Sequence, residues 1–479
     1  MKLLEWHTRR SVWASKLISN FIGTNSMRYR STRGGSSVSF SEAVAQGLAP
    51  DGGLYLPEEF PDFSSHLAAW ADLDYPSLCT EFFRHFATDL SADDLENCVH
   101  SAYAKFSNKH TAPLHELSKH WKCLELFHGP TLAFKDFALQ LLGNLYEVQI
   151  AREGKALCVL GATSGDTGAA AISGLLGKKG VTVFILYPKG KVSPLQEMQM
   201  TCTGSENVFP IAIEGTFDDA QRTVKELFAD LEFRTSVDLS AVNSINLARI
   251  LAQSVYYLYA WLKLPSEERE STTFVVPTGN FGNVFAGWLL TKMGINISEF
   301  RVATNQNDVL HRLFKSGEYS LGEVKPSLAP SMDIQVASNF ERLLYYFLNG
   351  DALRVSDVMK KFREEGKYSF DHFDISGFSS VSASDKEIPD LIQSVKQEYD
   401  YLVDPHTACA FKDLNPEKKA VILATAHPAK FPAVYQHAGM EIPISSSLEA
   451  LKSREPCSYE VSFDASSVRS FILEKISGK

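Results

Sequence analysis

The chain has 479 residues, a length that suggests two or three domains. Hydrophobic residues make up 44% of it and charged residues 22%, as in a typical globular protein. The formal net charge of -10 argues against a nucleic-acid or anionic-membrane partner, because phosphate-rich surfaces attract basic proteins. The seven cysteines are scattered without a CxxC pair, which indicates neither a disulfide framework nor a zinc site and fits a reducing compartment.

Residues 1–26 differ in composition from the rest of the chain. They carry four basic side chains against a single acidic one, Glu5, with apolar residues interleaved but no continuous apolar run. A secretory signal is therefore not expected. We favour a solvated extension or an upstream start, with Met27 as the natural first residue. An organelle transit peptide stays open as the alternative.

The remainder of the chain shows the alternation of an α/β protein. Residues 27–115 mix Gly/Pro turns with aromatic-rich helical stretches and contain no obvious catalytic cluster. From residue 121 onward, apolar β-branched runs alternate with Gly-punctuated helices, the pattern of a mostly parallel sheet covered by helices. The strands we predict include residues 157–160, 181–186, 273–276 and 421–424. The tail after about residue 445 is rich in Ser and charge, and we expect it to be peripheral.

These features divide the chain into four parts. The division is a basic extension over 1–26, an N-terminal domain over 27–115, an α/β domain over 116–445, for which the family resemblance given below implies a catalytic role and two lobes, and a C-terminal tail over 446–479.

The segment His128–Phe137 places Lys135 among apolar residues at the predicted start of a helix. Apolar residues then recur at i, i+3, i+4 and i+7 from Ala138, the spacing of a buried helical stripe. A charged lysine is costly to bury beside such a stripe, so its pKa should fall and its amine should become nucleophilic. A Schiff-base lysine needs this property. The alternative is a lysine that extends its ammonium group into solvent.

Two predicted strand–loop–helix junctions, at residues 161–168 and 277–283, are rich in glycine. Glycine lets the backbone approach a ligand closely, and inward N–H groups at a helix N-terminus attract an anion. Neither loop matches GxGxxG or contains the GK[ST] of a Walker loop, so binding of a dinucleotide or a nucleoside triphosphate lacks support. For each loop alone, an ordinary turn is the alternative.

Two further segments place polar residues where ligands bind in α/β proteins. Arg249 falls in the first two turns of a predicted helix, where an arginine is ordinarily unfavourable unless an anion lies between it and the helix amides. A distant carboxylate partner is the alternative. Thr425 follows an apolar strand and could present its hydroxyl to a heteroaromatic nitrogen. For His427, as for His128 and His406, we expect a structural role.

These segments read HGPTLAFKDFALQ, GATSGDTGAAA, NSINLARI, PTGNFGN and ATAHPAKFP, and STRG and APDGGLYLPE stand near the front. Together they resemble the threonine synthase family, in particular its longer microbial and fungal subgroup. The likeness runs in the same motif order from Met27 to about residue 445. It implies an enzyme that depends on pyridoxal 5'-phosphate (PLP). The implied fold is α/β and tryptophan-synthase-β-like, with two lobes of mostly parallel sheets and a family-specific N-terminal region.

The resemblance also implies roles for individual residues. Lys135 would be the catalytic residue that carries PLP as a Schiff base, and Thr425 would hydrogen-bond the pyridine nitrogen. The implied cradle for the cofactor phosphate is Gly279, Asn280, Phe281, Gly282 and Asn283. The implied site for the substrate α-carboxylate is Thr163, Ser164, Gly165, Asp166 and Thr167. The implied site for the substrate phosphate is Asn243, Ser244 and Arg249.

Asp166 stands where many relatives of this fold carry an asparagine near the cofactor's 3'-hydroxyl, and we do not assign it that contact. No metal is implied.

The implied reaction converts O-phospho-L-homoserine and water to L-threonine and phosphate, by loss of phosphate from Cγ and addition of water at Cβ. A phospholyase of the same fold that yields a 2-oxo acid is the alternative enzyme. A catalytically silent binding protein would be expected to lack the lysine or the phosphate loop, and both are present. We expect a cytoplasmic monomer or homodimer with no nucleic-acid or membrane partner.

Overall fold

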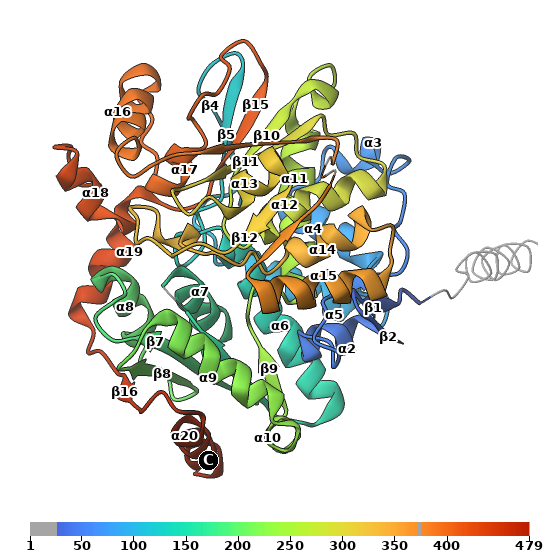
Figure 1. The fold of residues 1–479 in the computed structure, drawn as a ribbon, viewed down its shortest axis with the longest axis vertical. Coiled ribbons are helices and arrows are strands. Elements are labelled where there is room, and N and C mark those ends of the chain that lie inside the picture. Colours follow the sequence, from blue (N-terminus) through green and yellow to red (C-terminus); the bar gives the residue numbers. More distant parts are fainter. Residues whose placement is uncertain (1–25, 164, 372, 374, 479) are drawn as a thin grey trace, which may run out of the picture.

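The structure, a computed structural model, describes residues 26–163, 165–371, 373 and 375–478 (Figure 1). The extension that we expect over residues 1–26 lies, apart from Ser26, outside the described residues, and its interpretation stays a prediction. In the described part of the chain, no helix is long and apolar enough to cross a membrane.

Two sheets made mostly of parallel strands form the centres of two lobes (Figure 1). In the described residues, the larger sheet has the order β14-β11-β10-β15-β5-β4, with β4 antiparallel to β5. Its strands are β4 (Leu114–Glu116), β5 (Trp121–Glu125), β10 (Thr273–Pro277), β11 (Glu299–Thr304), β14 (Phe378–Ser382) and β15 (Ala420–Ala424). The smaller sheet has the order β16-β8-β7-β6-β9 and is parallel where its strands pair. Its strands are β6 (Leu157–Ala162), β7 (Val181–Pro188), β8 (Val208–Ile213), β9 (Leu239–Ala241) and β16 (Tyr459–Glu460).

The predicted strand runs are confirmed as β6, β7, β10 and β15. Both faces of the smaller sheet are buried, which explains why its strands read as continuous apolar runs. Val159 and Val183 face the main hydrophobic core, whereas Leu160 and Phe184 belong to a second cluster. Helix α7 (Asp166–Leu175) packs against β7, and α9 (Phe217–Ala229) packs against β6 and β7. The α/β class predicted from the sequence is therefore confirmed.

The N-terminal region shares its core with the catalytic lobes. It contains a three-stranded antiparallel sheet of β1 (Tyr29–Ser31), β2 (Gly34–Val38) and β3 (Tyr55–Pro57). Its helices α4 (Tyr75–Arg84) and α5 (Ala92–Tyr103) pack against α11 (Leu247–Lys263) and α6 (Lys135–Glu153), respectively. Because one hydrophobic cluster includes residues of β1, β3 and these four helices, the N-terminal region supports the helices of the catalytic lobes directly.

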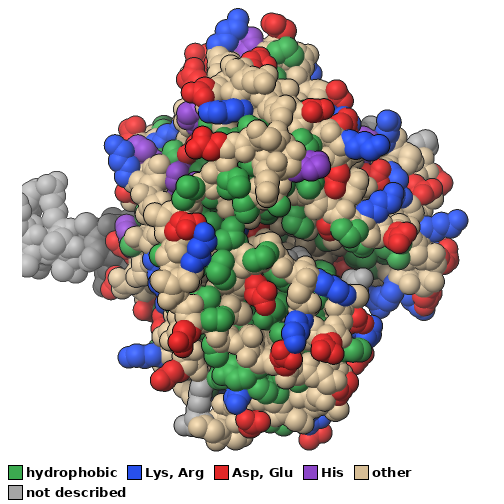
Figure 2. Space-filling view, turned by 90° about the vertical axis from the view of Figure 1, so that its left-hand side faces the viewer, with side chains coloured by type: hydrophobic (Ala, Val, Ile, Leu, Met, Phe, Trp, Pro, Cys, Tyr) green, Lys and Arg blue, Asp and Glu red, His purple; other side chains and the backbone are tan. Residues whose placement is uncertain are grey.

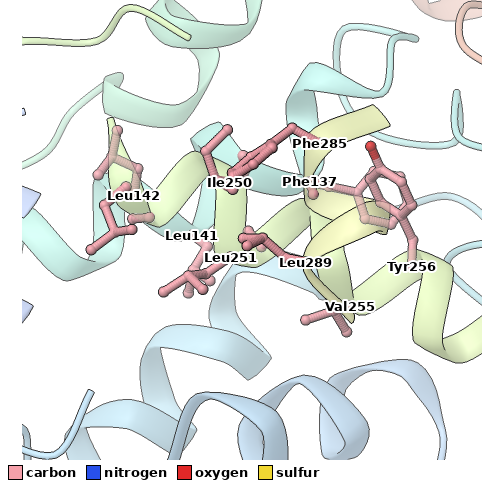
Figure 3. Close-up of a cluster of buried hydrophobic side chains, with 14 of the residues drawn as sticks. Phe137, Leu141, Leu142, Ile250, Leu251, Val255, Tyr256, Phe285 and Leu289 are labelled. Atoms are coloured by element: carbon pink, nitrogen blue, oxygen red, sulfur yellow. The ribbon is translucent and has the colours of Figure 1, made fainter. Parts of the chain in front are cut away.

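Three helices form the centre of this core. Figure 3 shows side chains of α6, α11 and α12 (Gly282–Leu289) interlocking, among them Leu141, Ile250 and Leu289. Each of these three side chains is fully buried. Buried aliphatic side chains contribute about 1.5 to 3 kcal/mol each, so the three helices are held firmly relative to one another. Their N-terminal ends are fixed by the same packing.

The expectation that the residues after about 445 are peripheral is wrong. β16 adds to the edge of the smaller sheet by parallel pairing with β8. Helix α20 (Ala465–Ser477) packs against α9, and its Val468 and Ile472 are fully buried in the second hydrophobic cluster. The C-terminal residues therefore complete the smaller lobe.

The described surface carries both signs of charge. Figure 2 shows acidic and basic side chains intermixed over one face of the molecule.

Candidate active site

Four helices begin around one pocket. Lys135, Asp166 and Gly282 are the first residues of α6, α7 and α12, and Arg249 is in the first turn of α11. The residues preceding α6, α7 and α12 provide no side-chain cap. The first N–H groups of a helix have no partner within it, and the helix dipole makes this end positive. The pocket is therefore suited to anions.

Most of the predicted site residues meet in this pocket. Those that line it are Lys135, Asp166, Thr167, Ser244, Arg249, Gly279, Asn280, Phe281, Gly282, Asn283 and Thr425. Thr163, Gly165 and Asn243 are not among the described residues that line it, and Ser164 lies outside the described residues. The Thr163 hydroxyl accepts hydrogen bonds from the backbone N–H groups of Gly165 and Gly168, at 3.0 and 2.8 Å. Thr163 thus shapes the loop.

Lys135 is enclosed as its sequence context predicts. Its side chain is only 11% exposed, so the alternative in which it extends into solvent is wrong. Burial, together with the charges of Lys430 and Arg249, lowers the pKa of the Lys135 ammonium, although the nearby Asp166 opposes this shift. A lysine in this environment is a good nucleophile and a good proton acceptor.

The Asp166 carboxylate is surrounded by donors. Its Oδ1 lies 2.8 Å from Lys430 Nζ and accepts from Gln196 at 2.9 Å. Its Oδ2 lies 3.4 Å from Lys135 Nζ and accepts from the Ser331 hydroxyl at 2.9 Å. Although burial opposes ionisation, Lys430 and Lys135 hold the pKa of Asp166 well below its usual range. Its negative side chain would repel a substrate carboxylate, which leaves only its backbone N–H for that contact.

Arg249 is a buried cation. It is 2% exposed, and its Nη1 donates to the Val242 carbonyl at 2.9 Å, whereas its Nε has no hydrogen-bond partner within the described part of the chain. Burial lowers the pKa of its guanidinium to about 10. Among the described residues no carboxylate forms an ion pair with it, so the alternative of a distant acidic partner is wrong. An arginine held in this way is poised to bind an anion.

The start of α12, with the loop before it, presents a second donor. The Asn283 Oδ1 accepts hydrogen bonds from the hydroxyls of Tyr256 and Tyr257, and no described residue pairs with its buried Nδ2 group. The loop is tightly packed: a Cβ atom on Gly282 would lie 3.0 Å from the Asn339 side chain. Phe281 adopts a left-handed conformation with φ 65°, which turns the chain into the helix.

Thr425 and the histidines lie near the ends of strands. Thr425 directly follows β15 and lines the pocket, and its carbonyl accepts from the Phe134 N–H at 2.9 Å. The His427 ring accepts a hydrogen bond from the Ala429 N–H at 3.1 Å, which agrees with the structural role expected for this residue. Both ring nitrogens of His406 are hydrogen-bonded, Nδ1 with Asp404 at 2.8 Å and Nε2 with the Ser331 N–H at 3.0 Å. His406 also lines the pocket.

Several pocket residues escaped the sequence interpretation. Ser331, Met332 and Gln253 line the pocket, and Lys430 lies behind Asp166. Ser331 and Met332 lie in the short 3-10 helix η3 (Pro330–Met332), which is too short to carry a periodic signal. Lys430 is part of the ATAHPAKFP segment, and a lysine between alanine and phenylalanine was a signal that could have been used.

A buried lysine of lowered pKa and uncapped helix N-termini suit a cofactor that carries an aldehyde and a phosphate, as PLP-dependent enzymes use. A family profile described as "Pyridoxal-phosphate dependent enzyme" matches residues 110–360, which establishes this class. Two further profiles, "Threonine synthase N terminus" and "Threonine synthase, C-terminal", match residues 28–103 and 406–472. The chain belongs to the threonine synthase family.

Individual relatives agree with this assignment. The chain is 44% identical over 426 residues to threonine synthase of Pseudomonas aeruginosa, covering 86% of this chain and 91% of the relative. The crystal structure of PLP-bound threonine synthase from Brucella melitensis is 40% identical, with a TM-score of 0.89 over 94% of this chain and 99% of that one. Yeast threonine synthase is 38% identical, with a TM-score of 0.86 over 95% and 99%. The C-terminal profile also corrects the expectation that the likeness ends near residue 445.

Proposed function

We propose that the enzyme converts O-phospho-L-homoserine and water to L-threonine and phosphate in a cytoplasmic setting. The observation that carries this proposal is the unpaired Arg249, which provides a second anion site separate from the α12 N-terminus. One anion site fits the cofactor phosphate and the other fits a phosphate on the substrate. An amino acid without a phosphate would leave the buried guanidinium unpaired, which is costly.

The residues present fit PLP. The unpartnered Asn283 Nδ2 and the uncapped start of α12 would bind the cofactor phosphate together with the backbone of residues 279–282. Lys135 would hold the cofactor aldehyde covalently, and Thr425 would hydrogen-bond the ring nitrogen. Bound PLP supplies an electron sink that stabilises negative charge next to the substrate's amino group.

The protein's own groups would orient the substrate and move its protons. The start of α7, with Thr167 and the Asp166 N–H, would bind the α-carboxylate. Ser244 and Arg249 would hold the phosphate at Cγ and stabilise it as it leaves. Once released from the cofactor, the neutral amine of Lys135 would accept the proton from Cα. The deep burial of these groups would restrict the access of solvent to the reacting atoms.

Product analysis tests this proposal. Purified enzyme would be supplied with O-phospho-L-homoserine while threonine, 2-oxobutyrate and phosphate are quantified separately. We expect threonine and phosphate in equal amounts. Phosphate accompanied by 2-oxobutyrate would instead identify a phospholyase. Light scattering on the same preparation would test the monomer or homodimer that we expect.

A further inference from the structure

Lys430 is a deeply buried charged group beside the pocket that the reaction as proposed does not use. It ends the 3-10 helix η4 (Pro428–Lys430), which follows β15, and its side chain is 1% exposed. Its ammonium group lies 2.8 Å from Asp166 Oδ1 and donates to the Thr131 carbonyl at 2.7 Å. A buried ammonium is expensive, so a lysine held this way calls for an explanation.

The two lysines compete for one carboxylate. Asp166 Oδ1 faces Lys430 at 2.8 Å, whereas Oδ2 faces Lys135 at the longer distance of 3.4 Å. Asp166 alone beside Lys135 would form a neutral buried pair and would hold the Lys135 amine protonated. With Lys430 in closer contact, the negative charge is largely neutralised before it acts on Lys135.

We propose that Lys430 is a positioning residue: by pairing with Asp166 it deprives Lys135 of a full counter-ion and so keeps the Lys135 amine free to react. This inference rests on the proposed role of Lys135 in holding PLP. Lys430 acts through Asp166 and has no part in contacting the substrate. The lowered pKa of Lys135 agrees with this arrangement.

Other charges around the three groups must be accounted for. Arg249 reinforces the effect of Lys430, since its charge also lowers the pKa of Lys135. His406 contributes to the low pKa of Asp166. Asp136 is the other carboxylate near Lys430, but the Thr131 N–H and hydroxyl bind it at 2.8 Å each, and burial raises its pKa to about 6. The pair of Lys430 and Asp166 is therefore the shortest charged contact that bears on Lys135.

Covalent capture of PLP provides the test. PLP would be added across a series of pH values to the full-length protein stripped of cofactor, and the growth of the visible absorption band would give the capture rate. The midpoint of the rate against pH reports the pKa of the Lys135 amine. Lys430→Met should move this midpoint upward by about 1 to 3 pH units, the range for a newly unshielded opposite charge. Below the midpoint, each unit lowers the neutral fraction, and hence the rate, about tenfold.

Three comparisons separate this role from a merely structural one. Lys430→Arg should restore the wild-type midpoint, because it keeps the cation beside Asp166. In an Asp166→Asn background, Lys430→Met should move the midpoint less, because only the direct repulsion between the two ammonium groups is then lost. Lys412→Met, which removes a lysine paired with Glu387 outside the pocket, should leave the midpoint unchanged.

The outcomes distinguish the inference from the proposed function. If the wild-type protein fails to capture PLP on Lys135, the proposed role of Lys135 is wrong. If the wild type captures PLP but folded Lys430→Met shows an unmoved or lowered midpoint, Lys430 does not act through Asp166. A slower rate at every pH with the same midpoint would also overturn the inference. Should Lys430→Met not fold, Lys430→Gln keeps a donor for the Thr131 carbonyl and must show the same upward shift.

Discussion

Replacing Arg249 with methionine should weaken phosphate binding without lowering the free energy of unfolding. Burial lowers the pKa of its guanidinium from 12.5 to about 10. At about 1.4 kcal/mol per unit, this cost amounts to roughly 3 kcal/mol in the ligand-free protein. The hydrogen bond to the Val242 carbonyl returns about 1.5 to 3 kcal/mol. Arg249→Met should therefore leave the free energy of unfolding unchanged or raise it by up to about 2 kcal/mol.

The same substitution should remove affinity for phosphate. Inorganic phosphate added to the PLP-loaded wild type should raise the melting temperature through mass action, and this rise should be lost in Arg249→Met. The affinity for O-phospho-L-homoserine should fall about ten- to a hundred-fold, as expected for a charge-assisted contact of roughly 1.5 to 3 kcal/mol. PLP should stay bound. Retained phosphate stabilisation, or loss of PLP with unchanged substrate kinetics, would show that the two phosphate sites are assigned the wrong way round.

Arg342 provides the matched control for this experiment. It is also fully buried, and burial lowers the pKa of its guanidinium to about 9. Unlike Arg249, it donates to the carbonyls of Tyr55 and Ile245 and to the Asn339 side chain. Arg342→Met would leave these acceptors unpaired, at about 1 to 3 kcal/mol each. It should lower the melting temperature clearly. Equal stability losses in both variants would refute the view that Arg249 is the binding cation.

Three other substitutions test separate parts of the site. Lys135→Ala should abolish turnover and the covalent trapping of PLP by borohydride; trapping that persists in this variant would place the link on another lysine. Gly282→Val should release PLP first, because a Cβ there lies 3.0 Å from the Asn339 side chain, and unchanged PLP retention in dialysis would contradict the cradle. Burial raises the pKa of Asp136 from 3.8 to about 6, so its ionised form costs roughly 3 kcal/mol at neutral pH. Wild-type stability relative to Asp136→Asn should therefore rise as pH falls from about 7 through 6 towards 4, and parallel denaturation curves across that range would refute it.

Residues whose environment is local could be predicted from the sequence. Lys135 stands next to the apolar stripe that buries it, and Arg249 stands near a helix start that disfavours a cation. In each case the conflict between a charge and its immediate neighbours indicated a ligand. The buried strands were equally visible, because a sheet covered on both faces produces continuous apolar runs.

The parts that escaped prediction depend on contacts distant in sequence. Lys430 contacts Asp166 only because β15 ends, and α7 begins, beside the same pocket. No local sequence pattern predicts this contact. The average composition of the C-terminal helix α20 is polar, and composition alone therefore predicts, wrongly, that it is peripheral. Its two fully buried residues, Val468 and Ile472, are spaced one helical turn apart, and this spacing was a better indicator than composition.

The charged groups around the pocket are positive in excess, and burying them costs free energy in the ligand-free protein. With the Lys135 amine neutral and Lys430 paired with Asp166, the Arg249 guanidinium keeps an excess positive charge that no carboxylate among the described residues pairs with, and the starts of α6, α7 and α12 add further positive potential. Two phosphates and a carboxylate would offset this excess when cofactor and substrate bind. The charge of Arg249 also lowers the pKa of the Lys135 ammonium. The positive charge that would bind an anion therefore also keeps the Lys135 amine reactive. The two functions are linked through one residue, since Asp166 determines how much of the positive charge Lys135 carries.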